Sequence, residues 1–124
     1  MEPRLTKQQE LAVLLARIRA EVPEVQGVIL ASHDGLPIST DFPEQQAARV
    51  GAMAATALGL ARRVVQTLNL ASFEEAVIRD KDGYLIVYAA GSKAVLTVAS
   101  PAGASLGMIH LVSREVAQGI ASKL

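Results

Sequence analysis

The stretch Val50–Ala61, VGAMAATALGLA, runs for twelve residues without a charge, between Arg49 on one side and the pair Arg62 and Arg63 on the other. It predicts the middle of one long helix over about residues 44–68. On a projection of 100° per residue, bulky apolar side chains gather on one side of this helix and small residues on the other. A helix lying on a solvated surface carries charges along its whole outer side. The uncharged small-residue side therefore predicts that something covers it.

The two sides of this helix predict two different contacts. The bulky side consists of Val50, Met53, Leu58, Leu60, Val64, Val65 and Leu68, and we expect it to pack on the chain's own sheet. The small side carries Gly51, Ala52, Ala55, Thr56 and Gly59. A glycine inside a helix costs up to about 1 kcal/mol relative to alanine, which favours close approach of another backbone there. We predict that these small residues contact a second copy across a two-fold axis. The alternative is that the chain's own elements bury the whole helix.

The rest of the chain alternates between helical and strand-like patterns. Helices are predicted over residues 7–22, 44–68 and 105–123, and strands over residues 25–31, 36–40, 73–80, 84–90 and 94–99. Thr6 is a plausible N-cap for the first helix. Asp34-Gly35 and Asp82-Gly83 lie between apolar runs, which indicates tight hairpins and antiparallel pairing. We predict one α+β domain over residues 1–124, with a five-stranded antiparallel sheet sandwiched by helices.

Composition excludes several classes of function. Twelve basic residues balance twelve acidic ones, so no overall field attracts nucleic acid. The chain has no cysteine, which excludes disulfides and thiolate metal sites. The hydrophobic fraction of 51% contains two Phe, two Tyr and no Trp, so an aromatic stacking platform is not expected. No segment approaches the ~20 apolar residues of a membrane span, and we expect a cytoplasmic protein.

Candidate catalytic groups are few. His33 falls in a turn and His110 on the last helix, each without a partner nearby in sequence. Asp34 and Asp82 precede glycines, where a role in the turn already accounts for them. The sequence lacks a nucleophile elbow, a P-loop and a dinucleotide fingerprint. We therefore predict no catalytic residue, cofactor or metal, and a binding or regulatory module rather than an enzyme.

Several stretches together resemble a known family. They are the hairpin VQGVILASHDGLPIST, the helix AARVGAMAATALGLARRV, the meander EEAVIRDKDGYLIVYAAGSKAVLTVAS and the final helix GASLGMIHLVSREVAQGIASKL. In order and spacing they resemble the Roadblock/dynein light chain family, especially its bacterial MglB-like branch. The resemblance extends from about Leu11 to Leu124.

This resemblance implies a cytoplasmic homodimer in which the long helices and the strands after them pair, forming one continuous sheet across two subunits. It also implies a non-enzymatic regulator or scaffold for a small Ras-like GTPase. The expected GTPase-binding residues are the polar positions towards the ends of the long helix: Gln45, Arg49, Arg62, Arg63 and Gln66. MglB-like regulators can stimulate hydrolysis without inserting an arginine, so these arginines are not expected to be arginine fingers. The alternative is a small-ligand sensor or a signalling adaptor coupled to a sensor kinase.

Overall fold

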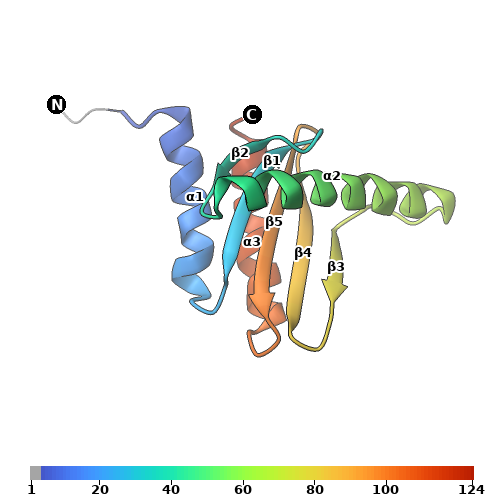
Figure 1. The fold of residues 1–124 in the computed structure, drawn as a ribbon. Helices are drawn as coiled ribbons and strands as arrows, with labels where there is room; N and C mark the ends of the chain where they lie inside the picture. Colours follow the sequence, from blue (N-terminus) through green and yellow to red (C-terminus); the bar gives the residue numbers. More distant parts are fainter. Residues whose placement is uncertain (1–3) are drawn as a thin grey trace.

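The computed structural model describes residues 4–124, which form three helices and a five-stranded sheet (Figure 1). The helices are α1 (Lys7–Glu21), α2 (Glu44–Thr67) and α3 (Leu106–Ala121), and the strands are β1 (Gly27–Ser32), β2 (Pro37–Thr40), β3 (Glu75–Arg79), β4 (Gly83–Ala90) and β5 (Ala94–Pro101). Every strand pairing is antiparallel, and the order across the sheet is β2-β1-β5-β4-β3. The predicted α+β class and order of elements are confirmed, with element ends within two residues of their predicted positions.

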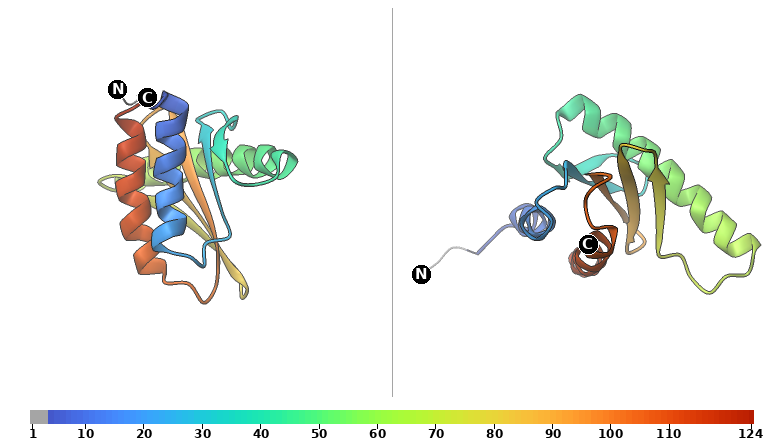
Figure 2. Two further views of the ribbon diagram at one scale, coloured as in Figure 1. Left: turned by 90° about the vertical axis from the view of Figure 1, so that its left-hand side faces the viewer. Right: turned by 90° about the horizontal axis from the view of Figure 1, so that it is seen from below.

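The sheet lies between two layers of helices. Figure 2 shows α1 and α3 side by side on one face, while α2 crosses the other face. Successive side chains of β4 point to opposite faces of the sheet. Ile86 and Tyr88 belong to the large core under α1 and α3, whereas Val87 packs under α2. Apart from Tyr88, the buried residues of the large core are aliphatic and include Ile18, Leu30, Leu96, Ile109 and Ile120.

Local chemistry fixes the ends of several elements. Thr6 forms the predicted N-cap of α1, since its hydroxyl accepts from Gln9 N–H at 3.1 Å and Gln9 Oε1 accepts from Thr6 N–H at 2.8 Å. Asp80 Oδ1 accepts from the backbone N–H groups of Asp82 and Gly83, at 2.8 and 2.9 Å, and closes the second hairpin. Both hairpins predicted from Asp-Gly pairs are therefore present.

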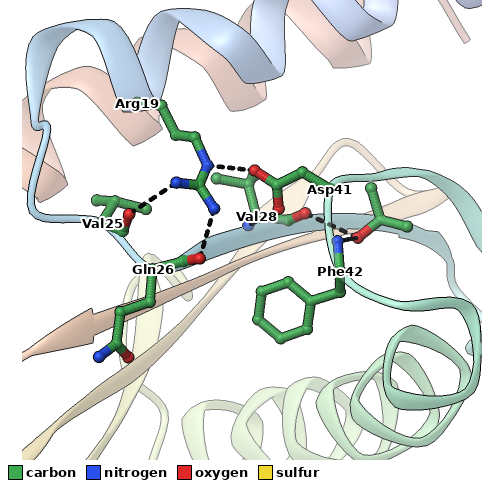
Figure 3. A network of polar contacts seen from close by, with 7 residues as sticks. Arg19, Val25, Gln26, Val28, Asp41 and Phe42 are labelled. Atoms are coloured by element: carbon green, nitrogen blue, oxygen red, sulfur yellow. Dashed lines mark hydrogen bonds and ion pairs between the residues drawn. The ribbon is translucent and has the colours of Figure 1, made fainter.

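A polar network ties α1 to the loop that starts α2 (Figure 3). The Arg19 guanidinium donates to the Val25 carbonyl at 3.1 Å and forms an ion pair with the Asp41 carboxylate. Asp41 Oδ1 in turn accepts from Val28 N–H at 2.9 Å. The end of α1, the start of β1 and the entry into α2 are thereby held together, which sets the position of α2 on the sheet. Across residues 4–124, no helix combines the length and the apolar character that crossing a membrane needs.

Candidate interaction surface

Helix α2 approaches the sheet through its small residues. Its buried positions are Ala47, Gly51, Ala54 and Leu58. Ala54 and Leu58 pack against Val87 and Val95, which belong to the central strands β4 and β5. Because three of the four buried positions have a side chain no larger than a methyl group, the helix axis lies close to the sheet.

Most of the bulky side of α2 is exposed, and the prediction that this side packs on the chain's own sheet is wrong for these residues. Met53, Leu60 and Val64 are 60%, 66% and 45% exposed, and Leu68 is exposed as well. The prediction is right for Leu58. At 100° per residue, Met53, Leu60 and Val64 fall within about 40° of one another, so they form one stripe. We call this stripe the open side of α2.

The opposite flank of α2 faces two turns of the same chain. A Cβ built on Gly51 would lie 2.9 Å from the Gly35 carbonyl oxygen, and one built on Gly35 would lie 2.8 Å from the Ala52 Cα. Gly35 has a φ of 93°, which favours glycine on steric grounds as well. Arg62 donates to the Gly91 carbonyl at 3.2 Å, in the turn between β4 and β5. We call this flank, comprising Gly51, Ala52 and Arg62, the turn side.

These contacts correct part of the predicted contact between copies. Gly51 is covered by its own chain rather than left open for a second copy, and Ala55 is partly buried against the cluster beneath α2. Ala52, Thr56 and Gly59 are exposed. The Thr56 hydroxyl donates to the Ala52 carbonyl at 2.9 Å, and a Cβ on Gly59 would meet open space. Their contact with a second copy stays a prediction, and a contact between copies through the open side competes with it.

The predicted GTPase-binding residues are spread along α2. Gln45, Arg49, Arg63 and Gln66 are exposed, whereas Arg62 is half-buried and bonded to Gly91. On the helical projection Gln45, Arg49 and Arg63 lie within about 40° of one another, on the side away from the sheet. They form an outer polar ridge between the open side and the turn side.

The open side of α2 looks towards an uncovered part of the sheet. Figure 1 shows α2 crossing near one end of the strands and extending beyond β3. Val50 lines a hollow of about 360 Å³ together with Phe42, Leu85 and Ala99. Pairing places Ile78 beside Leu85 on this same face, and Ile78 is 53% exposed. An apolar shelf therefore extends from α2 to the edge of the sheet.

Strand β3 is an edge strand, and within residues 4–124 it pairs with β4 alone. Val77 on the α3 face is 42% exposed, so exposed apolar side chains occur on both faces of the strand. Soluble proteins usually protect such edges with charges, prolines or covering elements. An open edge beside an exposed apolar helix stripe is typical of a protein-contact surface.

A polar cluster connects β3 to α3. The Glu75 carboxylate accepts from Arg114 Nε and Nη2, at 2.9 and 2.5 Å, and lies 3.7 Å from His110 Nδ1. His110 Nδ1 and the Tyr88 hydroxyl are hydrogen-bonded at 2.8 Å. His110 thus has partners on two strands, unlike the isolated helix-surface histidine predicted from sequence. The ion pair with Glu75 raises the pKa of Arg114, and burial raises the pKa of Tyr88.

A hollow of about 270 Å³ is open to solvent between β4 and α3, and its polar lining includes Glu74, Arg114 and Gln118. Arg114 is already paired there with Glu75. Within residues 4–124, no cluster of three or more acidic or histidine side chains is placed to hold a metal ion.

Taken together, these features define a three-layer α+β domain with a long helix reaching past one open sheet edge. The chain belongs to the Roadblock/LC7 domain family, whose model matches residues 7–100. Protein MJ0714 of Methanocaldococcus jannaschii is 32% identical over 97 residues, which cover 77% of this chain and 81% of that protein.

The fold is similar to that of solved MglB structures. Gliding protein MglB from Thermus thermophilus has a TM-score of 0.85 at 17% identity, and the match covers 99% of this chain and 97% of that one. An MglB with a tetrameric arrangement also has a TM-score of 0.85, at 18% identity, covering 99% of this chain and 96% of that one. At these identities the likeness shows a shared fold.

The residue pattern alone does not reveal the open edge of β3, which the sequence analysis reached only as an implication of the family resemblance. The segment around Val77 reads as an ordinary strand, and its place at the edge depends on a strand order that hairpin signals leave undetermined. The sequence carried one signal of a contact surface there. Helix α2 has more bulky apolar residues than the small side that packs on the sheet can account for.

Proposed function

We propose that this chain acts as a homodimer that regulates or anchors a small Ras-like GTPase and contributes no catalytic residue of its own. The observation that carries the proposal is the continuous exposed apolar surface formed by the open side of α2 and by β3. The family relationship supplies the class of partner.

The homodimer follows from the position of this surface at one edge of the sheet. When the β3 strands of two copies pair antiparallel, the two sheets become one, and both α2 helices lie on the same face of it. The open side of each helix looks along the sheet towards the two-fold axis, so Leu60 and Val64 of both copies meet there. Such a contact removes from water the residues whose exposure is otherwise unexplained.

The GTPase contact uses the outer polar ridge of α2. Gln45, Arg49 and Arg63 are exposed and remain so in this dimer, because they point away from the sheet. Two such ridges lie next to each other across the two-fold axis and form one polar platform. Arg62 and Gln66 flank it, with Arg62 held by the turn at Gly91. The arginines position the bound GTPase electrostatically, and the chemistry of GTP hydrolysis stays within the GTPase.

A binding experiment tests the proposed function. The purified dimer is passed over immobilised small Ras-like GTPases from the same organism, each loaded with GDP or with a non-hydrolysable GTP analogue. We expect binding that depends on the nucleotide and that weakens at least ten-fold in the double variant Arg49→Glu/Arg63→Glu. Lys7→Glu, on exposed α1, is the matched control and leaves binding unchanged. Absence of binding in both nucleotide states by a folded dimer contradicts the proposal.

A further inference from the structure

The α3 face of the sheet is covered unevenly. Helix α1 lies over β1 and β2, and α3 lies over β4 and β5, so within residues 4–124 no helix covers β3 on this face (Figure 2). Val77 of β3 pairs with Ile86, whose side chain belongs to the core under α1 and α3. Glu75, Val77 and Arg79 therefore share this face, because alternate residues of a strand point the same way. Together they form the floor of a step beside α3.

The wall of this step is a flank of α3 that contains small residues. On a projection of 100° per residue, Gly107, Arg114 and Ala121 lie within about 40° of one another. Arg114 is bonded to Glu75 of the floor at 2.9 Å, which identifies this flank as the one facing β3. Leu111 lies about 60° further out and is 57% exposed. The small residues let another backbone come close, and Leu111 offers an apolar contact above them.

The wall also contains a hollow of about 270 Å³ next to Arg114. Tyr88, Ala89, Ala117 and Ala121 line its apolar part. A hollow of this kind beside an exposed leucine can take one bulky apolar side chain of another molecule, as the central pockets of protein interfaces do. The step therefore offers an apolar pocket in addition to its floor and its wall.

The proposed homodimer turns two such steps into one trough. The two β3 strands lie side by side, so the floors join, and the α3 helices of the two copies form opposite walls. Neighbouring strands are about 4.8 Å apart, which puts the two α3 axes, each above β4 and β5, about 14–19 Å apart. Packed helices have axes about 8–10 Å apart, so one helix between two walls needs about 16–20 Å. The trough therefore has room for one helix.

The charges on the floor are unevenly satisfied. Glu74 and Glu75 are both paired with Arg114. The Arg79 guanidinium lies 5.5 Å from the centre of the Tyr84 ring, and within residues 4–124 it has no carboxylate partner. The two copies thus present two arginines that carboxylates can neutralise. A partner that offers acidic side chains matches this floor.

We propose that the trough binds one amphipathic helix of another protein, through an apolar stripe against Val77 and Leu111 and through acidic side chains that reach Arg79. This inference rests on the proposed homodimer, because one copy supplies one wall only. It adds a second partner, since the trough lies on the α3 face and the outer polar ridge for the GTPase lies on the α2 face. The dimer then links a GTPase to a protein that carries such a helix.

Symmetry fixes the stoichiometry of this complex. A helix has a direction, so the two-fold axis offers it two equivalent orientations, and the width of the trough admits one helix at a time. One helix therefore binds per two chains. A site contained in a single chain would instead bind one helix per chain.

Selection of peptides on the purified dimer tests the proposal. The displayed library consists of helical peptides of about 18 residues, which span about 27 Å, with leucine at every third or fourth position and the other positions randomised. We expect the selected peptides to be enriched in aspartate and glutamate, and calorimetry to give one peptide per two chains. Selection that yields no peptide, or a peptide that binds once per chain, overturns the proposal.

Two substitutions on α3 give the matched comparison. Leu111→Glu places a charge in the wall and should weaken binding of the selected peptide by about ten-fold or more. Met108 is 43% exposed and lies about 120° from Arg114, on the side of α1, so Met108→Glu should leave binding unchanged. Both positions are exposed, so neither change disturbs the core. Equal peptide binding by Leu111→Glu and the parent chain overturns the trough.

Arg79→Gln tests the acidic contact, because it removes the charge and keeps a polar side chain. It should weaken binding of the selected peptide about five-fold, and it should not affect the same peptide with its acidic residues replaced by glutamine. Sedimentation checks that the variant is still a dimer. Unchanged affinity for the acidic peptide in a dimeric variant overturns this contact.

The outcomes separate this inference from the proposed function. Arg49→Glu/Arg63→Glu should lose GTPase binding and keep peptide binding. A dimer that binds GTPase but yields no trough peptide overturns this inference alone. A chain that is monomeric at every concentration overturns both. One peptide per dimer without any GTPase binding supports the trough and contradicts the GTPase proposal.

Discussion

The two flanks of α2 have opposite surroundings. On the turn side, Gly51 lies under the Gly35 carbonyl and Arg62 reaches Gly91, so the chain itself occupies this flank. On the open side, Met53, Leu60 and Val64 are exposed to solvent although they are the larger apolar residues. The difference teaches that small residues mark where the chain's own backbone comes close, whereas exposed bulky residues mark where another molecule can bind.

The two edges of the sheet show the same contrast. β2 contains Pro37, which cannot donate to a further strand, and Gln8 Nε2 donates to the Ile38 carbonyl at 2.7 Å. β3 has neither a proline nor such a cap within the described residues, and it lies beside the exposed part of α2. The β2 edge is therefore blocked against a further strand, whereas the β3 edge can pair with one.

A charge placed on the open side of α2 should have the largest effect, and that effect should fall on dimer dissociation. Leu60→Arg places a charge in the contact between the two α2 helices, where it has no partner, and should raise the dimer dissociation constant at least 100-fold. Sedimentation velocity over a concentration series measures it. The matched control is Gly59→Arg, one residue away on the other flank, which should leave the dimer intact. If Gly59→Arg dissociates the dimer and Leu60→Arg does not, the two flanks have been assigned the wrong way round.

Adding one methyl group to each of two glycines tests the turn side. Gly51→Ala forces the Gly35 backbone to move, and we expect the free energy of unfolding to fall by about 1–2 kcal/mol. Gly59→Ala meets open space and should raise it by up to about 1 kcal/mol through helix propensity. Urea denaturation of both variants gives the comparison. Equal stabilisation by the two changes would mean that α2 does not contact the turn at Gly35.

The free energy of unfolding should depend on alkaline pH through Tyr88, which lies in the core under α1 and α3. Burial raises the pKa of Tyr88 in the folded state, so the folded chain holds this proton more tightly than the unfolded chain. The contribution is complete below the ordinary pKa of about 10 and is lost as pH rises from there through the raised folded-state value. The free energy of unfolding should fall with a slope of up to about 1.4 kcal/mol per pH unit from this residue.

Denaturant melts from pH 8 to pH 11 measure this slope. Tyr88→Phe should flatten it, and Tyr84→Phe, which keeps Tyr88, should not. Equal slopes in Tyr88→Phe and the parent chain would show that the Tyr88 hydroxyl is not buried in solution.

The smallest effect is expected at the closed edge. Gln8→Ala removes the hydrogen bond to the Ile38 carbonyl, which is exposed, and should cost less than about 1 kcal/mol of unfolding free energy. Amide hydrogen exchange in β2 should accelerate, while exchange in β3 stays unchanged. Faster exchange in β3 but not β2 would contradict the assignment of Gln8 to that edge.

The sequence predicts the local elements of this fold well, because their signals are local. Asp82-Gly83 specifies a hairpin, and Thr6 with Gln9 specifies a helix start, through contacts that span a few residues. Strand order, by contrast, depends on the pairing of β1 with β5, whose residues are more than sixty positions apart. The contact of Glu75 with His110 depends on that same long-range packing.

For α2, the sequence separates a small side from a bulky side but does not say which of the two packs on the sheet. The decision rests with the turn at Gly35, which needs a close approach on the small side, and with the turn at Gly91, whose carbonyl accepts from Arg62. The neighbour that selects a helix side is distant in sequence, so the helix alone cannot reveal it.

Intermolecular methyl contacts test the central claim most directly. A dimer mixed from isotope-labelled and unlabelled copies is measured by isotope-filtered nuclear Overhauser spectroscopy, which reports only contacts between copies. We predict intermolecular contacts among the methyl groups of Met53, Leu60 and Val64, and none from Ala52 or Thr56. Intermolecular contacts from Ala52 and Thr56, with none from Leu60, would contradict the account.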